Sequence, residues 1–293
     1  MNVLVTGATG FAGSHLVEYL KNHGYTVFSP RIDLLNATDT AGALKNKTFD
    51  SVFHLAAIAS TSDSYSFPGK ILKNNLLAQL NLLETFRRQD SHAKILIVGS
   101  ADEYGQGSKK PITEDAPLSP ASPYAVSKIA QDFMGLQYFL AYGMGVVRVR
   151  PFNHIGERQS LGFVVPDFAK QIIDIERTQK PGVIRVGNLD AVRDFTDVKD
   201  MVVAYELALR KGKPGDVYNL GSGRGVKIRH LLDQLVKHSK VDISIKVDTK
   251  KFRPGESPQL ICDASKFKKL TGWEPKVPLS DTLERVLEWW RKQ

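Results

Sequence analysis

The sequence predicts an α/β fold built around a doubly wound parallel sheet, and three observations lead to this prediction. Short apolar runs, rich in β-branched residues, lack polar alternation, which is typical of strands covered on both faces. Longer segments with apolar residues at helical spacing separate these runs. A glycine-rich turn, Gly7-Ala-Thr-Gly10-Phe-Ala-Gly13, directly follows the first apolar run. Strand and helix alternation with such a turn after the first strand favours a parallel sheet with helices on both sides.

The individual elements follow from local patterns. The first strand, 2–6, ends at the glycine turn, and the next helix, 15–23, is closed by Gly24. The segment 74–88 is expected to be a helix because its leucines recur at helical spacing. The other elements expected before residue 151 are strands at 25–29, 51–55, 94–98 and 145–150 and a helix at 122–142. After it we expect helices at 164–177, 198–210, 228–238 and 279–292, strands at 183–186 and 217–220, and further short strands after 227.

This order of elements predicts two interleaved domains. A Rossmann-type, dinucleotide-binding domain is expected over 1–155, with parts of 183–222 completing its sheet. A smaller C-terminal α/β domain, over 156–293, is expected mainly to bind the substrate. A chain of 293 residues is long enough to bury a full α/β core with such an appendage.

The composition is that of an ordinary globular protein, with 42% hydrophobic and 24% charged residues. A single cysteine, Cys262, excludes an intramolecular disulfide and a cysteine-based zinc site, and it fits a reducing cytoplasm. The histidines lack metal-ligand spacing, so we expect no metal. No run approaches the roughly 20 apolar residues of a membrane span. The first strand begins so early that it leaves no room for a signal peptide. We therefore expect a cytoplasmic protein that does not enter a membrane.

The net charge of +9 raises the question of a nucleic-acid partner. Most of the excess lies in scattered pairs such as Lys109-Lys110, Lys250-Lys251 and Lys268-Lys269, and not in one stripe with interleaved aromatic residues. We therefore expect a solvated basic surface and no nucleic-acid partner.

The glycine turn is a candidate phosphate site. Gly7, Gly10 and Gly13, with Phe11 among them, follow a strand and open a helix. This placement brings backbone N–H groups and the positive end of a helix to the pyrophosphate of a dinucleotide.

The end of the second strand bears on which dinucleotide binds. Arg31 stands where an acid usually holds the ribose 2′-hydroxyl, and an arginine there favours the 2′-phosphate of NADP(H). Asp33 follows so closely that NAD(H) stays possible, and we place Asp33 beside the adenine. The other expected cofactor contacts are Leu34 and, at the end of another strand, Leu55, Ala56 and Ala57, where small residues allow close approach of the backbone.

The segment Tyr124-Ala-Val-Ser-Lys128 is the candidate catalytic motif. Tyrosine and lysine four residues apart lie on one face of a helix, and the ammonium can favour the phenolate. Of the nine tyrosines, only Tyr124 has a lysine at this position. Ser100 ends an apolar run, at the strand edge where α/β sheets bind ligands. Its hydroxyl can bond the substrate oxygen that Tyr124 protonates, and Lys128 can also bond the nicotinamide ribose.

These residues give the chain a resemblance to the extended short-chain dehydrogenase/reductase family along nearly its whole length. Longer strings are similar to those of GDP-4-keto-6-deoxy-mannose reductases. They are Arg150-Pro-Phe-Asn-His-Ile-Gly156, Gly162-Phe-Val-Val-Pro-Asp-Phe-Ala-Lys170-Gln171, Val186-Gly-Asn-Leu-Asp-Ala-Val-Arg193-Asp-Phe-Thr-Asp197, Arg253-Pro-Gly-Glu256 and Thr271-Gly-Trp-Glu-Pro275.

The resemblance implies a GDP-linked 6-deoxy sugar as substrate, held by Asn153, Lys170, Arg193 and Arg253. Arginine forks and a lysine ammonium are suited to a diphosphate. The same resemblance implies further substrate contacts from Asp102, Val164 and Glu256.

Two related reactions remain open for this chain. GDP-mannose 4,6-dehydratases also remove water, which calls for an acid/base pair after the serine position. Here Ala101 cannot exchange a proton, and Asp102 is one methylene shorter than the usual glutamate. Asp102 does not decide by itself, but the chain also resembles the reductases in its short length and in its string Gly99-Ser-Ala-Asp-Glu-Tyr-Gly105. We therefore favour NAD(P)H-dependent reduction of the C4 keto group of GDP-4-keto-6-deoxy-D-mannose to GDP-D-rhamnose, with the dehydratase as the alternative. A C4 epimerase is a third possibility. An RNA-binding or redox-sensing module on the same fold is the non-enzymatic one.

Two helices predict an oligomer. The segments 74–88 and 122–142 are apolar on more than one face. In this family such a pair packs against its twin in a four-helix bundle, so we expect a homodimer. The alternative is that loops of the same chain cover the second face.

Overall fold

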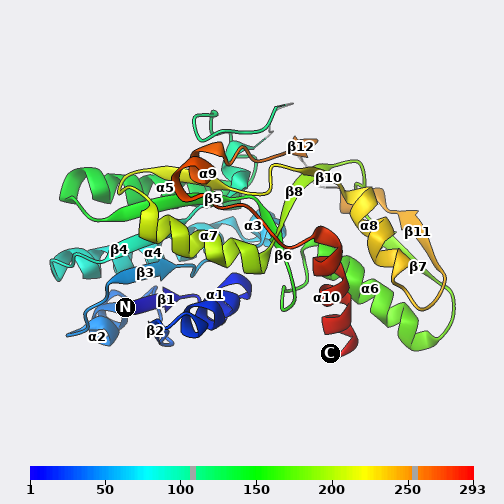
Figure 1. Ribbon diagram of the computed structural model, residues 1–293, viewed down its shortest axis with the longest axis horizontal. Coiled ribbons are helices and arrows are strands. Elements are labelled where there is room, and N and C mark those ends of the chain that lie inside the picture. The colour runs from blue at the N-terminus through cyan, green and yellow to red at the C-terminus, as the bar shows by residue number, and fades with distance from the viewer. Residues whose placement is uncertain (106–109, 253–256) are drawn as a thin grey trace.

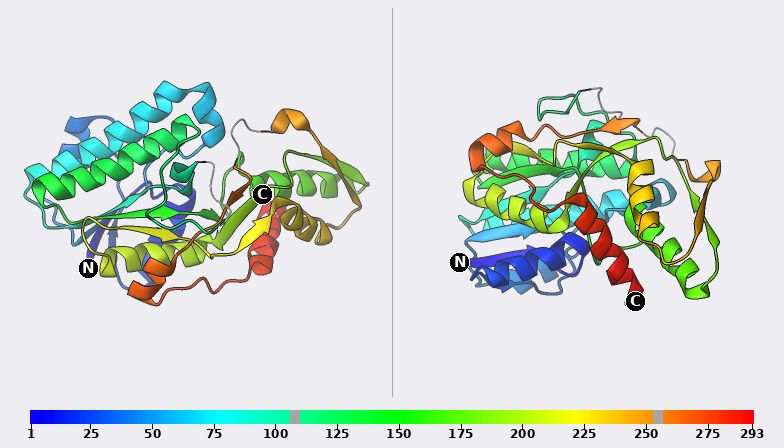
Figure 2. Two further views of the ribbon diagram at one scale, coloured as in Figure 1. Left: turned by 90° about the horizontal axis from the view of Figure 1, so that it is seen from above. Right: turned by 45° about the vertical axis from the view of Figure 1, so that its right-hand side comes forward.

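The computed structural model describes residues 1–105, 110–252 and 257–293 and divides into two bodies (Figures 1 and 2). The larger body holds the N-terminus and the main sheet. The smaller body holds helix α10, at the C-terminus. The C-terminal part of the sequence also contributes to the larger body, because helix α9 (Ser265–Thr271) packs on its sheet.

The main sheet confirms the predicted Rossmann-type fold. Its strands lie in the order β2-β1-β3-β4-β5-β9, and every neighbouring pair is parallel. The chain builds β2 on one side of β1 and then crosses to build β3 on the other side. The six strands are β1 (Asn2–Thr6), β2 (Thr26–Phe28), β3 (Ser51–His54), β4 (Lys94–Val98), β5 (Val146–Pro151) and β9 (Val217–Leu220).

Helices cover both faces of this sheet, as expected for strands without polar alternation. Val3 and Val5 of β1 pack in one core with α1, α7 and α9, whereas Leu4 between them packs in a second core with α2, α4 and α5. The short α3 (Thr61–Ser66) contacts α4 and α5. The bounds are α1 (Phe11–Asn22), α2 (Ala37–Leu44), α4 (Pro68–Arg88), α5 (Pro123–Tyr142), α7 (Val198–Lys211) and α9 (Ser265–Thr271).

The smaller body has its own apolar core, formed by three helices and short strands. Strand β8 pairs with β6, β10 and β12, and β7 pairs with β11 in a separate two-stranded sheet. The elements are β6 (Asn153–Ile155), α6 (Val164–Thr178), β7 (Gly182–Val186), β8 (Val192–Asp197), β10 (Gly225–Lys227), α8 (Ile228–Lys237), β11 (Ile243–Val247), β12 (Gln259–Leu260) and α10 (Leu279–Arg291). Two 3-10 helices, η1 (Ala101–Tyr104) and η2 (Thr249–Lys251), complete the set.

Some element boundaries differ from the sequence-based prediction. Helix α1 begins at Phe11 and not at residue 15, because Gly10 is already its N-cap. Helix α4 begins at Pro68 and not at residue 74, with a proline in the first turn, where its missing N–H costs nothing. Within the segment 183–222, β9 lies in the main sheet, whereas β7 does not. The boundary between 1–155 and 156–293 stays a prediction.

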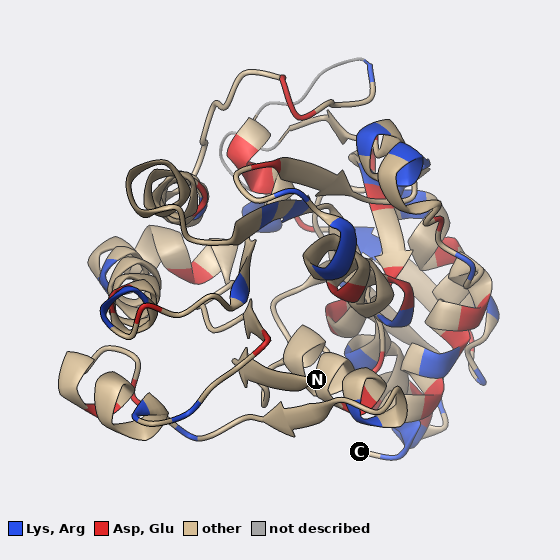
Figure 3. Cartoon of the chain, turned by 60° about the vertical axis from the view of Figure 1, so that its left-hand side comes forward, with Lys and Arg blue, Asp and Glu red and all other residues tan. Residues whose placement is uncertain are grey.

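Surface properties follow the composition. Figure 3 shows Lys and Arg on many elements, interspersed with Asp and Glu. Among the described residues, no helix combines the length and the apolar character that crossing a bilayer requires.

Candidate active site

The glycine turn brings β1, β3 and α1 into close contact. Gly7 has a φ of +71°, and a Cβ there would lie 2.7 Å from the backbone nitrogen of Ala56. A Cβ on Gly13 would lie 2.0 Å from the carbonyl oxygen of Gly7, so only glycine lets the helix pack onto the turn. Gly10 has no side chain to cap α1, and the first turn of α1 contains no acidic residue. The turn therefore offers an anion the positive end of a helix.

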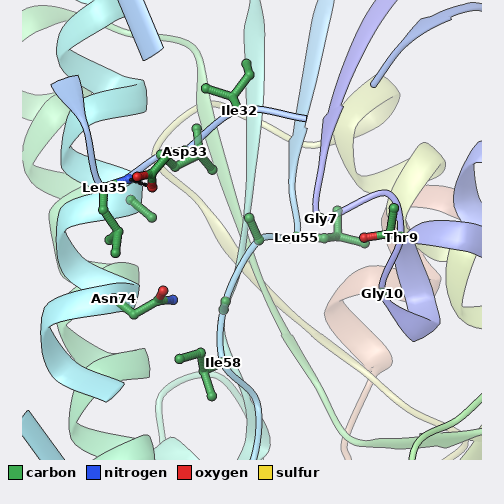
Figure 4. A pocket seen from close by; sticks show the side chains of 13 residues that line it. Gly7, Thr9, Gly10, Ile32, Asp33, Leu35, Leu55, Ile58 and Asn74 are labelled. Atoms are coloured by element: carbon green, nitrogen blue, oxygen red, sulfur yellow. Dashed lines mark hydrogen bonds between the residues drawn. The ribbon is translucent and has the colours of Figure 1, made fainter. Parts of the chain in front are cut away.

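A cleft opens beside this turn at the edge of the sheet where the strand order reverses. It lies between the ends of β1 and β3, the place where doubly wound sheets bind ligands. The cleft has a volume of about 380 Å³. In Figure 4, Gly7, Thr9 and Gly10 lie on one side of it and Asp33 and Leu35 on the other. An adjoining hollow of about 630 Å³ shares part of this lining and extends to Ser29, Pro30 and Arg31.

Most of the predicted cofactor residues line these two cavities. They are Gly7, Gly10, Arg31, Asp33, Leu34, Leu55, Ala56 and Ala57. Four predicted residues, Phe11, Gly13, Tyr124 and Lys128, do not. Gly13 is buried under the turn, and the ring of Phe11 stacks on His154 with centroids 5.8 Å apart. Sequence reasoning missed Thr9, Ile32, Leu35, Ile58 and Asn74, which also line the smaller cleft. Thr9 was the one within reach of that reasoning, because it lies inside the glycine turn.

Ser100 and Tyr124 come together from two elements. Ser100 follows β4 and is the N-cap of η1, and Tyr124 lies in the first turn of α5. Burial raises the pKa of the Tyr124 phenol well above its usual value, and the nearby Asp102 carboxylate adds to the rise. A hydrogen bond with the Ser100 side chain acts in the opposite direction. Tyr124 is therefore protonated at neutral pH and can act as an acid.

Lys128 lies one helical turn from Tyr124, but its ammonium has other partners. Its Nζ donates to the carbonyl oxygen of Val98 (2.7 Å) and to Oε1 of Gln131 (3.0 Å). Nζ lies 6.0 Å from the centroid of the Tyr124 ring. Burial lowers the pKa of Lys128 to about 8, against the opposing effect of Glu103. The expected stabilisation of a Tyr124 phenolate is thus outweighed by the burial of the phenol.

Asp102 belongs to the same cluster. Its Oδ2 accepts a hydrogen bond from the Thr61 hydroxyl (3.1 Å), and its charge acts on Tyr124. Sequence reasoning missed Thr61. The residue begins the short helix α3, and no spacing in the sequence links it to Asp102.

Four of the predicted substrate residues lie on the smaller body, whereas Asp102 lies on η1. Asn153 is on β6 and Arg193 on β8, and these two strands are paired. The Arg193 guanidinium donates to the carbonyl oxygen of Val192 (2.9 Å). Val164 is the first residue of α6, and Lys170, farther along α6, forms an ion pair with Asp174. Arg253 and Glu256 lie outside the described residues.

The described residues form no metal centre. Within residues 1–105, 110–252 and 257–293, no three His, Cys, Asp or Glu side chains gather where they could hold a metal ion. Cys262 is buried and free.

Comparisons with known proteins point to one family. The family model described as GDP-mannose 4,6 dehydratase matches residues 29–286. A GDP-6-deoxy-D-mannose reductase of Pseudomonas aeruginosa is 35% identical over 99% of this chain and 97% of its own length.

Solved structures agree over the whole chain. The structure of RMD from Pseudomonas aeruginosa complexed with NADPH has a TM-score of 0.91 and 32% identity, and covers 99% of both chains. A UDP-glucose 4-epimerase of Thermus thermophilus in complex with NAD has a TM-score of 0.86 and 28% identity, and covers 99% of both chains. With the glycine turn and the Ser100, Tyr124 and Lys128 cluster in place, the chain belongs to the GDP-mannose 4,6-dehydratase family of nucleotide-sugar enzymes, within the extended short-chain dehydrogenases/reductases.

Proposed function

We propose that the protein reduces the C4 keto group of GDP-4-keto-6-deoxy-D-mannose to give GDP-D-rhamnose, with NAD(P)H as the reductant. The observation that carries this proposal is the Tyr124 phenol, which is buried, protonated and hydrogen-bonded to Ser100. The chain also belongs to a family that includes a Pseudomonas aeruginosa protein named GDP-6-deoxy-D-mannose reductase.

The cleft at the glycine turn fits a nicotinamide dinucleotide. Gly7 and Gly13 leave no space for a Cβ, and the uncapped end of α1 suits a pyrophosphate. The residues proposed to hold the dinucleotide are Gly7, Gly10, Phe11, Gly13, Arg31, Asp33, Leu34, Leu55, Ala56, Ala57, Tyr124 and Lys128. When bound, this cofactor supplies the hydride for C4. Phe11 contributes through the position of α1, because its ring packs on His154.

The chain's own residues control the proton. Tyr124 donates its phenolic proton to the oxygen on C4 as negative charge develops there, and Ser100 donates a hydrogen bond to the same oxygen. Burial strengthens both interactions because the local dielectric is low. Lys128, which already donates to two oxygens, can turn to the ribose hydroxyls of the dinucleotide.

The smaller body is proposed to hold the GDP-sugar. Asn153 and Arg193 lie on paired strands, and Lys170 lies on the helix that Val164 begins. Arg193 and Lys170 supply positive charge for the diphosphate. Asp102, fixed by Thr61, is proposed to contact the sugar near C4. Arg253 and Glu256 keep the roles that the resemblance implies.

A GDP-mannose 4,6-dehydratase is the second candidate. Two observations favour it, the family model's description and the position of the Asp102 carboxylate close to Tyr124. Elimination of water needs a further proton carrier beside the acid, and Ala101 cannot be one. The reductase is therefore preferred.

One experiment separates the two reactions. The purified protein is incubated with GDP-mannose, and separately with its 4-keto-6-deoxy derivative, each with NADPH or NADH, and the products are identified. Reduction of the keto sugar supports the proposal. Consumption of GDP-mannose alone with a keto product identifies the dehydratase, and no turnover of either sugar contradicts both.

The choice of nicotinamide is proposed to rest on Arg31, with NADP(H) preferred over NAD(H). Arg31 lines the larger hollow together with Ser29 and with Gly7 and Thr9 of the glycine turn. Its fork suits a 2′-phosphate. In Arg31→Ala we expect KM for NADPH to rise about tenfold or more, the cost of one charged hydrogen-bonding partner, with KM for NADH within about twofold. An equal rise for both cofactors would contradict this role.

We also propose a cytoplasmic homodimer formed through α4 and α5. These helices pack side by side on the sheet. On α5, Val126, Phe133 and Leu140 recur every seven residues and are 44%, 49% and 71% exposed. A seven-residue apolar repeat on a helix is typical of a helix–helix seam.

A further inference from the structure

A buried group of charges lies directly beneath the turn that carries Ser100. It consists of Glu103 on η1, Asp132 on α5 and two arginines on β5, Arg148 and Arg150. The side chains of Glu103 and Asp132 are 0% and 1% exposed, and those of Arg148 and Arg150 are 7% and 4% exposed. Charges this deeply buried are costly unless they are paired, so their arrangement is expected to be specific.

Glu103 holds Ser100 through the backbone. Its Oε1 accepts the N–H of Ser100 (2.7 Å), while Ser100 Oγ accepts the N–H of Asp102 (3.1 Å). The two bonds form a reciprocal capping box at the start of η1. The carboxylate lies so close to the chain that a Cβ on Gly99 would be 2.2 Å from its oxygen. The conformation of the turn at Gly99 and Ser100 therefore depends on its close contact with the Glu103 side chain.

Arg150 links this turn to the helix that carries Tyr124. Its Nε lies 3.0 Å from Glu103 Oε2 and donates to Asp132 Oδ2 (2.8 Å). A second nitrogen, Nη2, donates to the same Asp132 oxygen (2.5 Å), and Nη1 donates to the Tyr104 hydroxyl (3.0 Å). Asp132 follows Tyr124 by two helical turns and Lys128 by one, so all three lie on one face of α5.

We propose that Arg150 is a positioning residue for the reaction at Tyr124. Through Glu103 it fixes the turn that presents Ser100, and through Asp132 it fixes the helix that presents Tyr124 and Lys128. The guanidinium thus sets the separation between a hydroxyl on η1 and a phenol on α5. This inference rests on the proposed function, since it assigns Ser100 and Tyr124 a shared reacting oxygen. Glu103 and Asp132 belong to the same device and contact no substrate.

The electrostatics of the group agree with this role. Burial raises the pKa of Glu103, with Asp132 adding to the rise and Arg150 opposing it. The positive charge of Arg150 thus offsets part of the cost of burying Glu103, whose Oε1 accepts the Ser100 N–H. The charge of Glu103 also acts on Lys128, whose pKa it raises against the effect of burial.

Arg148 provides a matched control within the same strand. It is two residues before Arg150, it is similarly buried, and its Nη1 donates to the other oxygen of Asp132 (2.7 Å). Its Nη2 donates to the carbonyl oxygen of Gly215 (2.8 Å), shortly before β9. Arg148 thus shares the strand, the burial and the carboxylate of Arg150, while its hydrogen bonds go to Asp132 and Gly215 and not to Glu103 or Tyr104.

The test compares Arg150→Lys, Glu103→Gln and Arg148→Lys, each measured below its own melting transition so that folded protein is assayed. A lysine keeps the charge but cannot bridge two carboxylates as a fork does. For Arg150→Lys and Glu103→Gln we expect kcat to fall about 10- to 100-fold, the effect of a misplaced catalytic group, with KM for sugar and NADPH within about twofold. For Arg148→Lys we expect an altered melting temperature with kcat within about twofold of wild type.

Two results would overturn the inference. One is an equal loss of kcat in Arg148→Lys and Arg150→Lys, which would indicate a general packing effect. The other is full kcat in Arg150→Lys and Glu103→Gln. Should Arg150→Lys fail to fold, the comparison of Glu103→Gln with Arg148→Lys decides in the same way.

A structural measurement separates this inference from the proposed function. If wild-type protein reduces no sugar, the proposed function fails, and crystal structures of the variants decide the inference. A larger separation between Ser100 Oγ and Tyr124 Oη in Arg150→Lys, with no change in Arg148→Lys, supports it. An unchanged separation in Arg150→Lys contradicts it.

Discussion

Tyr124 is almost wholly removed from water, and this burial favours the neutral phenol beyond its ordinary preference. A phenolate in such a place would lose its hydration, so the pKa rises and the neutral acid dominates. A protonated tyrosine suits a reductase, which must give a proton to the new alcohol. An enzyme that begins by oxidising an alcohol would need Tyr124 as a phenolate base instead. It would first have to bring the Lys128 ammonium closer to the Tyr124 phenol.

Removal of the phenolic hydroxyl tests this reading most directly. For Tyr124→Phe we expect kcat to fall about 10²- to 10⁴-fold, the usual contribution of general acid catalysis. The affinity for the GDP-sugar, measured by calorimetry, should change little because the ring stays in place. Phe133→Tyr, on the exposed face of the same helix, is a control for helix integrity. Unaltered turnover in Tyr124→Phe would rule out the proton-donor role.

A second residue gives the protein a defined sensitivity to acid. His54 is buried at the end of β3 with Nδ1 2.8 Å from Thr6 Oγ1, and burial lowers its pKa to about 3 from 6.5. Between these two values the unfolded chain binds a proton that the folded chain does not. Stability is therefore retained above pH 6.5 and lost as the pH falls towards 3, by about 1.4 kcal/mol per pH unit for this group alone.

Urea denaturation at pH 6, 5 and 4 checks this expectation. The free energy of unfolding should fall less steeply with pH in His54→Gln than in wild type. His92→Gln, at an exposed position, should keep the wild-type slope. Parallel slopes for wild type and His54→Gln would contradict the assignment.

At the residue scale, sequence reasoning found groups that share a motif and missed groups that meet only in space. Tyr124 and Lys128 can be identified in the sequence by their four-residue spacing on one helix. Thr61 and Asp102 come from elements 41 residues apart, and their contact depends on how α3 lies against η1. The direction of the Tyr124 pKa shift was also beyond sequence reasoning, because a neighbouring lysine is visible in a sequence and burial is not.

At the scale of elements, the glycine turn shows how tightly one loop is constrained. Gly7 approaches the backbone of Leu55 and Ala56, just after β3, and Gly13 approaches the backbone of Gly7, so α1 can begin immediately at Phe11. A sequence pattern identifies such a turn, but it does not say how soon the helix starts after it. For this reason the predicted start at residue 15 was too late. The strands of the main sheet were predicted more closely, because burial on both faces leaves a continuous apolar run.

Gly13→Ala is expected to damage this turn. Its Cβ would lie 2.0 Å from the Gly7 oxygen and 2.8 Å from the Gly7 carbonyl carbon, backbone atoms that cannot rotate away. We expect a loss of about 1–3 kcal/mol of stability, as for overpacking elsewhere, and at least tenfold weaker binding of dinucleotide, about 1.4 kcal/mol.

Gly42→Ala is the matched control. This glycine also lies in a helix, α2, and nothing is within 4 Å of an added Cβ. Here the change should be neutral or stabilise the protein by up to about 1 kcal/mol. Chemical denaturation and fluorescence titration with NADPH measure both quantities, and unchanged binding in Gly13→Ala would show that the turn tolerates the extra atom.

At the scale of the whole molecule, the proposed dimer is the property most open to direct measurement. Leu140 and Phe133 are exposed apolar side chains on a helix whose other face is buried against the sheet. Covering them in a second copy would remove them from water. We expect wild-type protein to have the mass of a dimer in light scattering and the double variant Phe133→Glu, Leu140→Glu to be a monomer.

Val183→Glu serves as the control for that experiment. Val183 is 53% exposed, but it lies on β7 in the smaller body. A charge there should leave the mass unchanged. A monomeric wild type, or a dimer that survives both substitutions on α5, would contradict the proposed interface.

The path of the chain between the two bodies has a consequence for how the protein can be divided. After β5 the chain leaves the main sheet for β6, returns with α7 and β9, leaves again for β10 and α8, and returns once more with α9 before α10. A gene cut after residue 155 would therefore strip the N-terminal fragment of a helix layer and an edge strand. Neither fragment should fold when expressed alone, although co-expression of the two could restore the enzyme.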